Sequence, residues 1–143
     1  VMKKLLTLLM LLSVSISVFS QENRVGFEEA QNLAKEQHKR IMILFQGSDW
    51  CAPCIKWERS VWSSEEFNAF AEEELIVVKA DFPRRKSNQL SSAIQEKNKE
   101  LAERYNTNGY FPFVVLLSPE LKILKSFSYI DYTPKQMIDY FNE

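Results

Sequence analysis

The sequence predicts an α/β protein, a sandwich in which helices cover both faces of a mixed central sheet. Apolar runs of strand length alternate along the chain with segments whose apolar residues recur at helical spacing. The resulting order is helix, strand, helix, strand, helix, strand, strand, helix. Parallel strands joined by helices need cover on both faces of the sheet, and the last two strands form an antiparallel hairpin near the C-terminus.

The first two elements are an amphipathic helix and a buried strand. The helix is predicted over Phe27 to Lys39, with its apolar side formed by Phe27, Ala30, Leu33 and Ala34. Ile41 to Phe45 is apolar without interruption, which is typical of a central strand buried on both faces. Residues 46–49 form a loop, and a helix begins at the cysteine motif that follows. Pro53 fits its first turn, where an amide N–H needs no helical partner.

The middle of the chain is predicted to contain a helix, a strand and a second, longer helix. Ser63 to Glu66 has the pattern of a capping box, and it opens a helical stretch that runs through Phe70. Leu75 to Phe82 is the next strand. A long helix is predicted over Asn88 to Tyr105, because apolar residues recur there at helical spacing, at Leu90, Ile94, Leu101 and Tyr105.

The C-terminal part is predicted to be a hairpin followed by a helix. A turn at Asn108-Gly109 leads to a strand over Phe113 to Leu117. A tight reversal at residues 118–120 then connects to a second strand, Ile123 to Tyr129. Thr133-Pro134 opens the last helix, whose inward residues are Met137, Tyr140 and Phe141.

The N-terminus is predicted to direct export. Lys3 and Lys4 precede an uncharged, mostly apolar stretch from Leu5 to Ser20, as in a secretory signal. We therefore expect a signal peptide over residues 1–20 and one domain over residues 21–143. The alternative is an uncleaved membrane anchor, for which the apolar stretch is short of the roughly 20 residues that a spanning helix needs.

Charge and composition argue against several classes of function. The formal net charge is −1, and it becomes −3 once Lys3 and Lys4 are removed, so no nucleic-acid partner is expected. Three glycines leave little room for a phosphate-binding loop. The cluster Arg84-Arg85-Lys86 is interpreted as a solvated loop rather than an anion site. We expect a monomer.

Cys51 and Cys54 are the only cysteines of the chain. A disulfide closing so short a loop stabilises a fold by only about 2 kcal/mol, against roughly 4.7 kcal/mol for a 100-residue loop. The pair is therefore better suited to a dithiol–disulfide cycle than to holding the fold together. A helix N-terminus favours the thiolate at Cys51, the expected nucleophile. Cys54, one turn further along, is expected to be more buried and to resolve the mixed disulfide.

Two runs carry a resemblance to a known family, Trp50-Cys51-Ala52-Pro53-Cys54 and Gly109-Tyr110-Phe111-Pro112-Phe113. The first resembles the active-site motif of thioredoxins, and the second resembles that family's X-Pro before a strand. The order of elements is also that of the thioredoxin-like three-layer α/β/α sandwich. The run from Gly47 to Cys51 is similar to exported bacterial members, and to the C-terminal domain of transmembrane thiol:disulfide interchange proteins.

The resemblance implies roles for several residues. Cys51 and Cys54 would be catalytic, and the substrate would bind at Trp50, Pro53, Phe111 and Pro112. It also implies a cis Phe111-Pro112 peptide beside the cysteines, where a substrate chain can pair as an added strand. The alternative is an ordinary trans proline at the start of a strand.

One acidic residue of thioredoxins has no counterpart here. Thioredoxins carry a buried Asp on the strand before the motif, where this chain has Leu44 or Phe45. Glu58 is the proposed substitute in proton transfer, because it lies four residues after Cys54 and thus on the same helix face. The alternative is that Glu58 is a surface residue. Asp49 is interpreted as an exposed loop acid, and two thiolates alone make a poor metal site.

The predicted function is that of a thiol:disulfide oxidoreductase that reduces or exchanges protein disulfides in the periplasm. Ala52-Pro53 lacks the His of strongly oxidising family members and is close to the Gly-Pro of reducing thioredoxins. The expected partners are protein disulfide substrates and a membrane electron-donor thiol:disulfide interchange protein, without a cofactor. The alternatives are an oxidase or isomerase that donates disulfides, and a redox-inert binding or chaperone module on the same fold.

Overall fold

A computed structural model describes residues 25–143, so the predictions for residues 1–20 lie outside the described part of the chain. The strands are β1 (Arg40–Gln46), β2 (Leu75–Asp81), β3 (Phe113–Leu117) and β4 (Ile123–Ser128). The helices are α2 (Phe27–Gln37), α3 (Ala52–Trp57), α4 (Glu65–Glu74), α5 (Ser92–Tyr105) and α6 (Pro134–Asn142), with a π-helical turn η1 (Glu58–Trp62) and a 3-10 turn η2 (Lys86–Asn88). Of the helices over residues 25–143, none has the length and apolar character required to cross a membrane.

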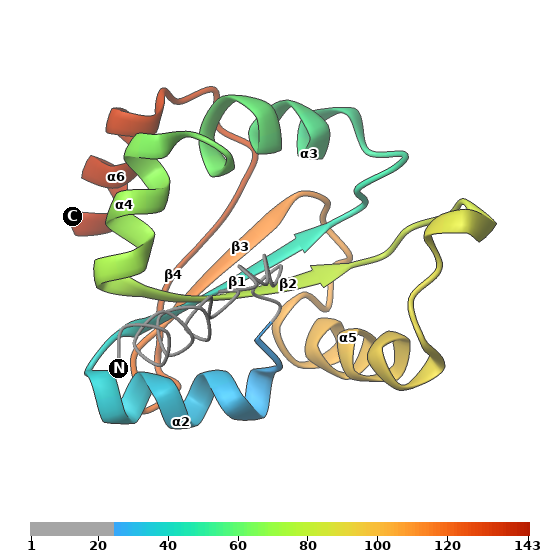
Figure 1. Cartoon of the computed structure of the whole chain (residues 1–143), viewed down its shortest axis with the longest axis horizontal. Coiled ribbons are helices and arrows are strands. Elements are labelled where there is room, and N and C mark those ends of the chain that lie inside the picture. Colours follow the sequence, from blue (N-terminus) through green and yellow to red (C-terminus); the bar gives the residue numbers. More distant parts are fainter. Residues whose placement is uncertain (1–24) are drawn as a thin grey trace, which may run out of the picture.

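The four strands form one mixed sheet in the order β2-β1-β3-β4. β1 and β2 are parallel, β1 and β3 are antiparallel, and β3 and β4 make the antiparallel hairpin. Helices α3, α4 and α6 lie on one face of the sheet, and α2 and α5 lie on the other (Figure 1). The predicted three-layer α/β/α sandwich with a mixed sheet and a C-terminal hairpin is confirmed.

β1 is buried on both faces because its alternate side chains enter two different cores. Met42 and Leu44 point toward α3, α4 and α6, whereas Ile41, Ile43 and Phe45 point toward α2 and α5. All five are at most 1% exposed. This arrangement explains the uninterrupted apolar run in the sequence, and it makes β1 the strand on which both layers depend.

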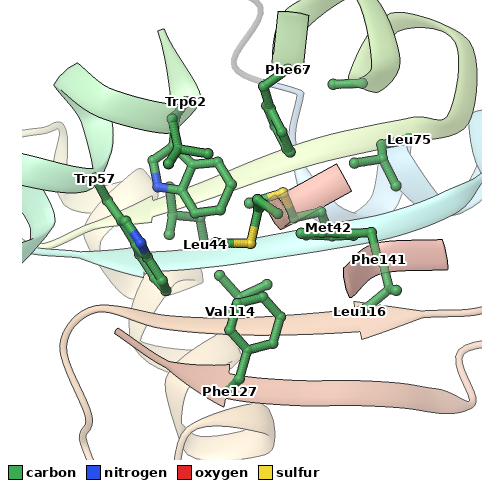
Figure 2. Close-up of a cluster of buried hydrophobic side chains, with 13 residues drawn as sticks. Met42, Leu44, Trp57, Trp62, Phe67, Leu75, Val114, Leu116, Phe127 and Phe141 are labelled. Carbon is green, nitrogen blue, oxygen red and sulfur yellow. The ribbon is translucent and has the colours of Figure 1, made fainter. Parts of the chain in front are cut away.

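The core beneath α3, α4 and α6 is rich in aromatic side chains (Figure 2). Trp57 belongs to this core, with its ring centroid 5.0 Å from that of Trp62 and 6.0 Å from that of Phe127. Its indole Nε1 donates a hydrogen bond of 2.9 Å to the backbone carbonyl of Ile130. Burial of Trp57 and Trp62 therefore attaches the segment that follows the cysteines to the body of the fold.

Two local predictions were wrong, both at helix starts. The helix expected from Asn88 begins at Ser92, where the Ser91 side chain caps it, and Ile94 is 44% exposed. Residues 88–90 lie instead in the loop before α5, which Asp49 binds through Asn88 as described below. The expected capping box at Ser63 to Glu66 is absent: Ser64 caps α4 by accepting from the Phe67 N–H, because Ser63 still ends the π-helical turn.

Candidate functional site

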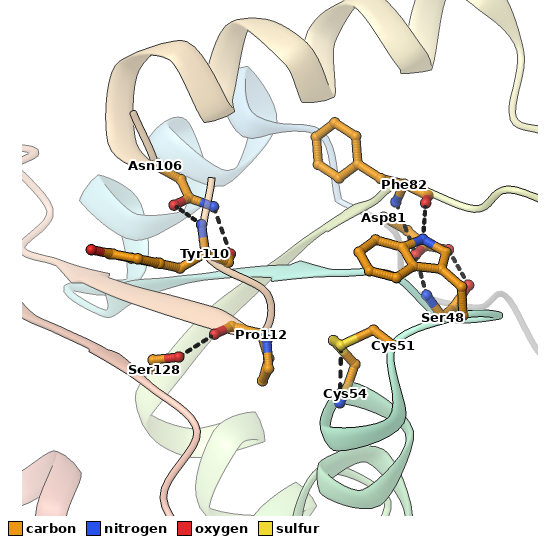
Figure 3. Close-up of a disulfide and its surroundings, with 10 residues drawn as sticks. Ser48, Cys51, Cys54, Asp81, Phe82, Asn106, Tyr110, Pro112 and Ser128 are labelled. Atoms are coloured by element: carbon orange, nitrogen blue, oxygen red, sulfur yellow. Dashed lines mark hydrogen bonds between the residues drawn. A yellow bond between two sulfur atoms is a disulfide. The ribbon is translucent and has the colours of Figure 1, made fainter. Parts of the chain in front are cut away.

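Cys51 and Cys54 form a disulfide directly after the loop that leaves the C-terminal end of β1. Cys51 is the N-cap of α3, and its Sγ accepts a hydrogen bond of 3.3 Å from the Cys54 backbone N–H. Pro53 lies in the first turn of α3, as predicted, and is exposed. Cys51 is 5% exposed and Cys54 2%. Figure 3 shows the pair at the start of its helix, with Pro112 facing it.

The Trp50 side chain is held in a defined position beside the pair. Its Nε1 donates a hydrogen bond of 2.7 Å to the Phe82 carbonyl. Its ring packs edge-on against the Phe111 ring, with the ring centroids 5.6 Å apart. The indole lies against Gly47, where an added Cβ atom would overlap the ring. Gly47 is therefore required for the close approach of Trp50, a contact between residues three apart that no residue pattern indicates.

We expect Gly47→Ala to displace the Trp50 indole and to lower the free energy of unfolding by about 1–3 kcal/mol, the usual cost of overpacking a close contact. Equilibrium denaturation in guanidinium would measure the loss. Gly26→Ala is the matched control, because a Cβ there meets no atom within 4 Å. Equal stability of Gly47→Ala and Gly26→Ala would contradict the steric role.

Asp49 attaches the loop after β2 to the motif, and it is not a free loop acid. Its carboxylate accepts hydrogen bonds from the backbone N–H groups of Arg84 and Arg85, both at 2.9 Å, and from Asn88 Nδ2 at 3.1 Å. The Arg84 N–H, with these other donors, holds the pKa of the Asp49 carboxyl below its usual value. A lowered pKa means that the attachment contributes stability at neutral pH and loses it as the pH falls through that pKa.

A second acid, Asp81, binds the loop that leads from β1 to the cysteine motif, and the sequence analysis did not single it out. Asp81 ends β2, opposite Gln46, and is 6% exposed. Its carboxylate accepts from the Ser48 N–H at 2.9 Å and the Ser48 hydroxyl at 2.6 Å, and also from the Phe82 N–H. The only available signal was an acidic residue that closes an apolar strand, which does not reveal its partner 33 residues earlier.

The second predicted run lies beside the motif. The Phe111-Pro112 peptide bond is cis, as expected. The turn before it is closed by Asn106, whose amide side chain accepts from the Tyr110 N–H at 3.0 Å and donates to the Tyr110 carbonyl at 2.9 Å. The Ser128 hydroxyl donates to the Pro112 carbonyl at 2.9 Å, so β4 also supports this turn.

Glu58 lies one helical turn after Cys54, on the same side of the helix. Both residues line a cavity of about 120 Å³, together with Gln46 and Ser48. Lys79 of β2 pairs with Glu58, with Nζ 3.3 Å from Oε1, and both side chains are more than one third exposed. The predicted position of Glu58 relative to Cys54 is thus observed.

Within residues 25–143, no three His, Cys, Asp or Glu side chains are grouped so that they could hold a metal ion.

Residues 22–119 match the family model described as thioredoxin-like. The chain is 38% identical over 99 residues to the disulfide bond reductase DsbH of Chlamydia pneumoniae, an alignment that covers 69% of this chain and 58% of the relative. The chain thus spans little more than half the length of that relative.

Solved structures support the same comparison. A structure of the DsbH oxidoreductase superimposes with a TM-score of 0.76 at 31% identity, covering 82% of this chain and 80% of that one. The oxidised C-terminal domain of DsbD from Neisseria meningitidis superimposes with a TM-score of 0.53 at 16% identity, covering 80% and 89%. At that identity the second comparison concerns the fold alone.

Proposed function

Because the chain belongs to the thioredoxin-like family, we propose that it is a thiol:disulfide oxidoreductase that reduces or exchanges protein disulfides through Cys51 and Cys54. One observation carries the proposal. The two cysteines form a disulfide at the start of α3, immediately after the loop from the central strand, where a vicinal pair contributes little to stability.

The electrons of the reaction come from the two thiols alone. The Cys51 thiolate attacks one sulfur of the substrate disulfide, forms a mixed disulfide and releases the other substrate sulfur as a thiolate. The Cys54 thiolate then attacks the Cys51 sulfur, which closes the intramolecular disulfide and releases the second substrate thiolate. Two electrons pass to the substrate, whose thiolates take up the protons. The Cys54 N–H that contacts Cys51 Sγ is placed to stabilise the attacking thiolate.

The substrate chain would bind across Trp50, Pro53, Phe111 and Pro112. Pro53 is exposed, Trp50 and Phe111 are partly exposed, and the Trp50 and Phe111 rings are in contact. The backbone before the cis proline would pair with the substrate as an added strand, while the two aromatic rings would pack against its side chains. This surface is adjacent to Cys51, the residue that would attack first.

Glu58 would move the proton of Cys54, and this role has a direct test. We expect Glu58→Gln to slow resolution of the mixed disulfide by about tenfold, less than the roughly 10²–10⁴-fold that is usual for general acid–base catalysis, because water also reaches this partly exposed side chain. The rate measured across pH should lose its dependence on one group. Glu73→Gln, on the exposed side of α4, is the matched control. An unchanged pH–rate profile would reduce Glu58 to a surface partner of Lys79.

We propose further that the protein acts as a monomer in the periplasm, after removal of residues 1–20 from the domain over 21–143. There a membrane thiol:disulfide interchange protein would keep the pair reduced. The name of the C. pneumoniae relative, a disulfide bond reductase, supports the reducing direction. The absence of a His between the cysteines supports it as well.

Two measurements test the activity and its direction. Insulin reduction, followed by turbidity with dithiothreitol as the reductant, should be accelerated by the protein, and no acceleration would favour a redox-inert binding module. The reduction potential of the pair, equilibrated in glutathione buffers, should lie below about −180 mV, toward that of thioredoxin at about −270 mV. A potential well above −180 mV would assign the protein to disulfide donation.

A further inference from the structure

Four exposed cations lie on two segments next to the cysteine motif, η1 and the loop that Asp49 binds, and we refer to them as the cationic rim: Arg59, Arg84, Arg85 and Lys86. Arg59 lines the same small cavity as Cys54. The other three follow Pro83 in the loop attached to the motif. Among residues 25–143 the ion pairs involve Lys56, Lys79 and Lys135, so no acid in this part of the chain pairs with the rim.

The loop presents Arg84 directly at the redox motif. Its guanidinium carbon lies 3.7 Å from the centre of the Trp50 ring, a stacked cation–π geometry. Asp49 accepts from the successive backbone N–H groups of Arg84 and Arg85, and the Trp50 indole donates to the Phe82 carbonyl. Within residues 25–143 the Arg84 guanidinium makes no hydrogen bond, so its N–H groups are available to a ligand while its face rests on Trp50.

The acids nearest to the motif are already engaged. Asp49 accepts from the loop backbone, Asp81 accepts from Ser48 and the Phe82 N–H, and Glu58 pairs with Lys79. Asp49 and Asp81 accept from uncharged donors and keep their negative charges, so the four cations of the rim outnumber two carboxylates. The local surface is therefore positive, although the formal net charge of the chain is −1. A positive patch on a chain of this overall charge favours a ligand that brings negative charge to this one place.

We propose that the cationic rim binds acidic side chains that flank the disulfide of a substrate protein. The proposal rests on the proposed function and names the kind of protein that is reduced. A guanidinium stacked on an indole can still accept a carboxylate in its plane, with two parallel N–H···O bonds. Since Arg84 lies on Trp50, next to Cys51, such a carboxylate would orient the substrate chain as its disulfide meets the Cys51 sulfur.

The test uses three synthetic peptides of one length, each closed by a single disulfide and differing only in four flanking residues: Glu, Gln or Lys. We expect the reduced protein to react with the Glu peptide about tenfold faster than with the Gln peptide at low salt, and with the Lys peptide most slowly. In 0.5 M NaCl the three rates should converge, because salt screens exposed charges.

Variants locate the effect. Arg84→Gln should lower the Glu-to-Gln rate ratio about two- to fivefold, the weight of one exposed charge pair with good geometry. Neutralising the whole rim, with Arg59→Gln, Arg84→Gln, Arg85→Gln and Lys86→Gln combined, should bring the ratio close to one. Arg104→Gln is the matched control, because Arg104 also stacks on an aromatic ring, 4.9 Å from the centre of Tyr105, on α5 in the other helical layer. Its ratio should equal that of the parent protein.

A binding measurement separates this proposal from the proposed function. The Glu peptide with serines in place of its cysteines should bind the oxidised protein and shift the NMR signals of residues 84–86. Such binding without reduction of any peptide would refute the proposed reductase activity but support the binding of acidic chains by the rim. Equal reduction of all three peptides would refute the preference for acidic chains but support the reductase activity. Binding to phosphatidylglycerol vesicles without preference among the peptides would also overturn it, and would assign the rim to a lipid surface.

Discussion

Cys51→Ser should reduce the insulin reduction rate to that of dithiothreitol alone, a loss of about a thousandfold or more in the catalysed rate. The serine oxygen cannot form the mixed disulfide, and Cys54, the one remaining cysteine, is only 2% exposed and therefore poorly accessible to a substrate disulfide. Turbidity of insulin B chain against time gives the rate. Activity retained by Cys51→Ser would place the chemistry elsewhere.

Cys54→Ala should have the opposite phenotype, because attack proceeds and resolution fails. We expect mixed disulfides between Cys51 and client proteins to accumulate, visible as adducts on non-reducing gels that dithiothreitol removes. The matched control is the double variant Cys51→Ser, Cys54→Ala, which should trap nothing. Adducts formed equally by the double variant would show that capture does not pass through Cys51.

Trp57→Ala should lower the free energy of unfolding by about 3–5 kcal/mol, the largest stability effect that we expect from one substitution. Trp57 is 1% exposed and packs against Trp62, Phe127 and Tyr129. Its loss would leave a large cavity beneath α3 and remove one of the two hydrogen bonds to the Ile130 carbonyl, which would keep only the bond from the Tyr132 N–H. Guanidinium denaturation of the oxidised protein, followed by far-UV circular dichroism, would measure the change.

The control for Trp57 is Leu124→Ala, because Leu124 is 47% exposed on β4 and should cost less than about 1 kcal/mol. A Trp57→Ala protein as stable as Leu124→Ala would mean that the aromatic core does not hold the segment after the cysteines. Far-UV detection is preferred here, since the substitution removes one of three tryptophans and would disturb a fluorescence signal.

The sequence predicted the layers and the motif, since both depend on local patterns. The apolar run of β1 and the helical spacing of α2 and α6 survive in the structure because each pattern matches the face that is buried. Pro53 in the first turn and the cis bond before Pro112 were likewise expected from short motifs. The positions of Cys51, Cys54 and Glu58 on one helix follow from chain spacing alone.

What the sequence did not reveal depends on contacts between distant residues. Asp49 looked like an exposed loop acid, yet its partners Arg84 and Arg85 lie about 35 residues later. Asp81 binds Ser48 only because the register of β1 and β2 places Asp81 opposite Gln46. The start of α5 was misplaced for the same reason, since the loop before it is held by Asp49 and not by its own helical spacing.

The π-helical turn after α3 separates two demands on one helical segment. In this turn the Ser63 N–H donates to the Glu58 carbonyl, five residues earlier, where an α-helix would use a carbonyl four residues earlier. The extra residue rotates the side chains that follow about the helix axis. Val61 and Trp62 therefore lie in the core, while Cys54 and Glu58 line one small cavity on the other side of the segment. Deleting one residue would turn this segment into a regular α-helix. Either Val61 and Trp62 would then leave the core, or Cys51 and Cys54 would lose their present orientation.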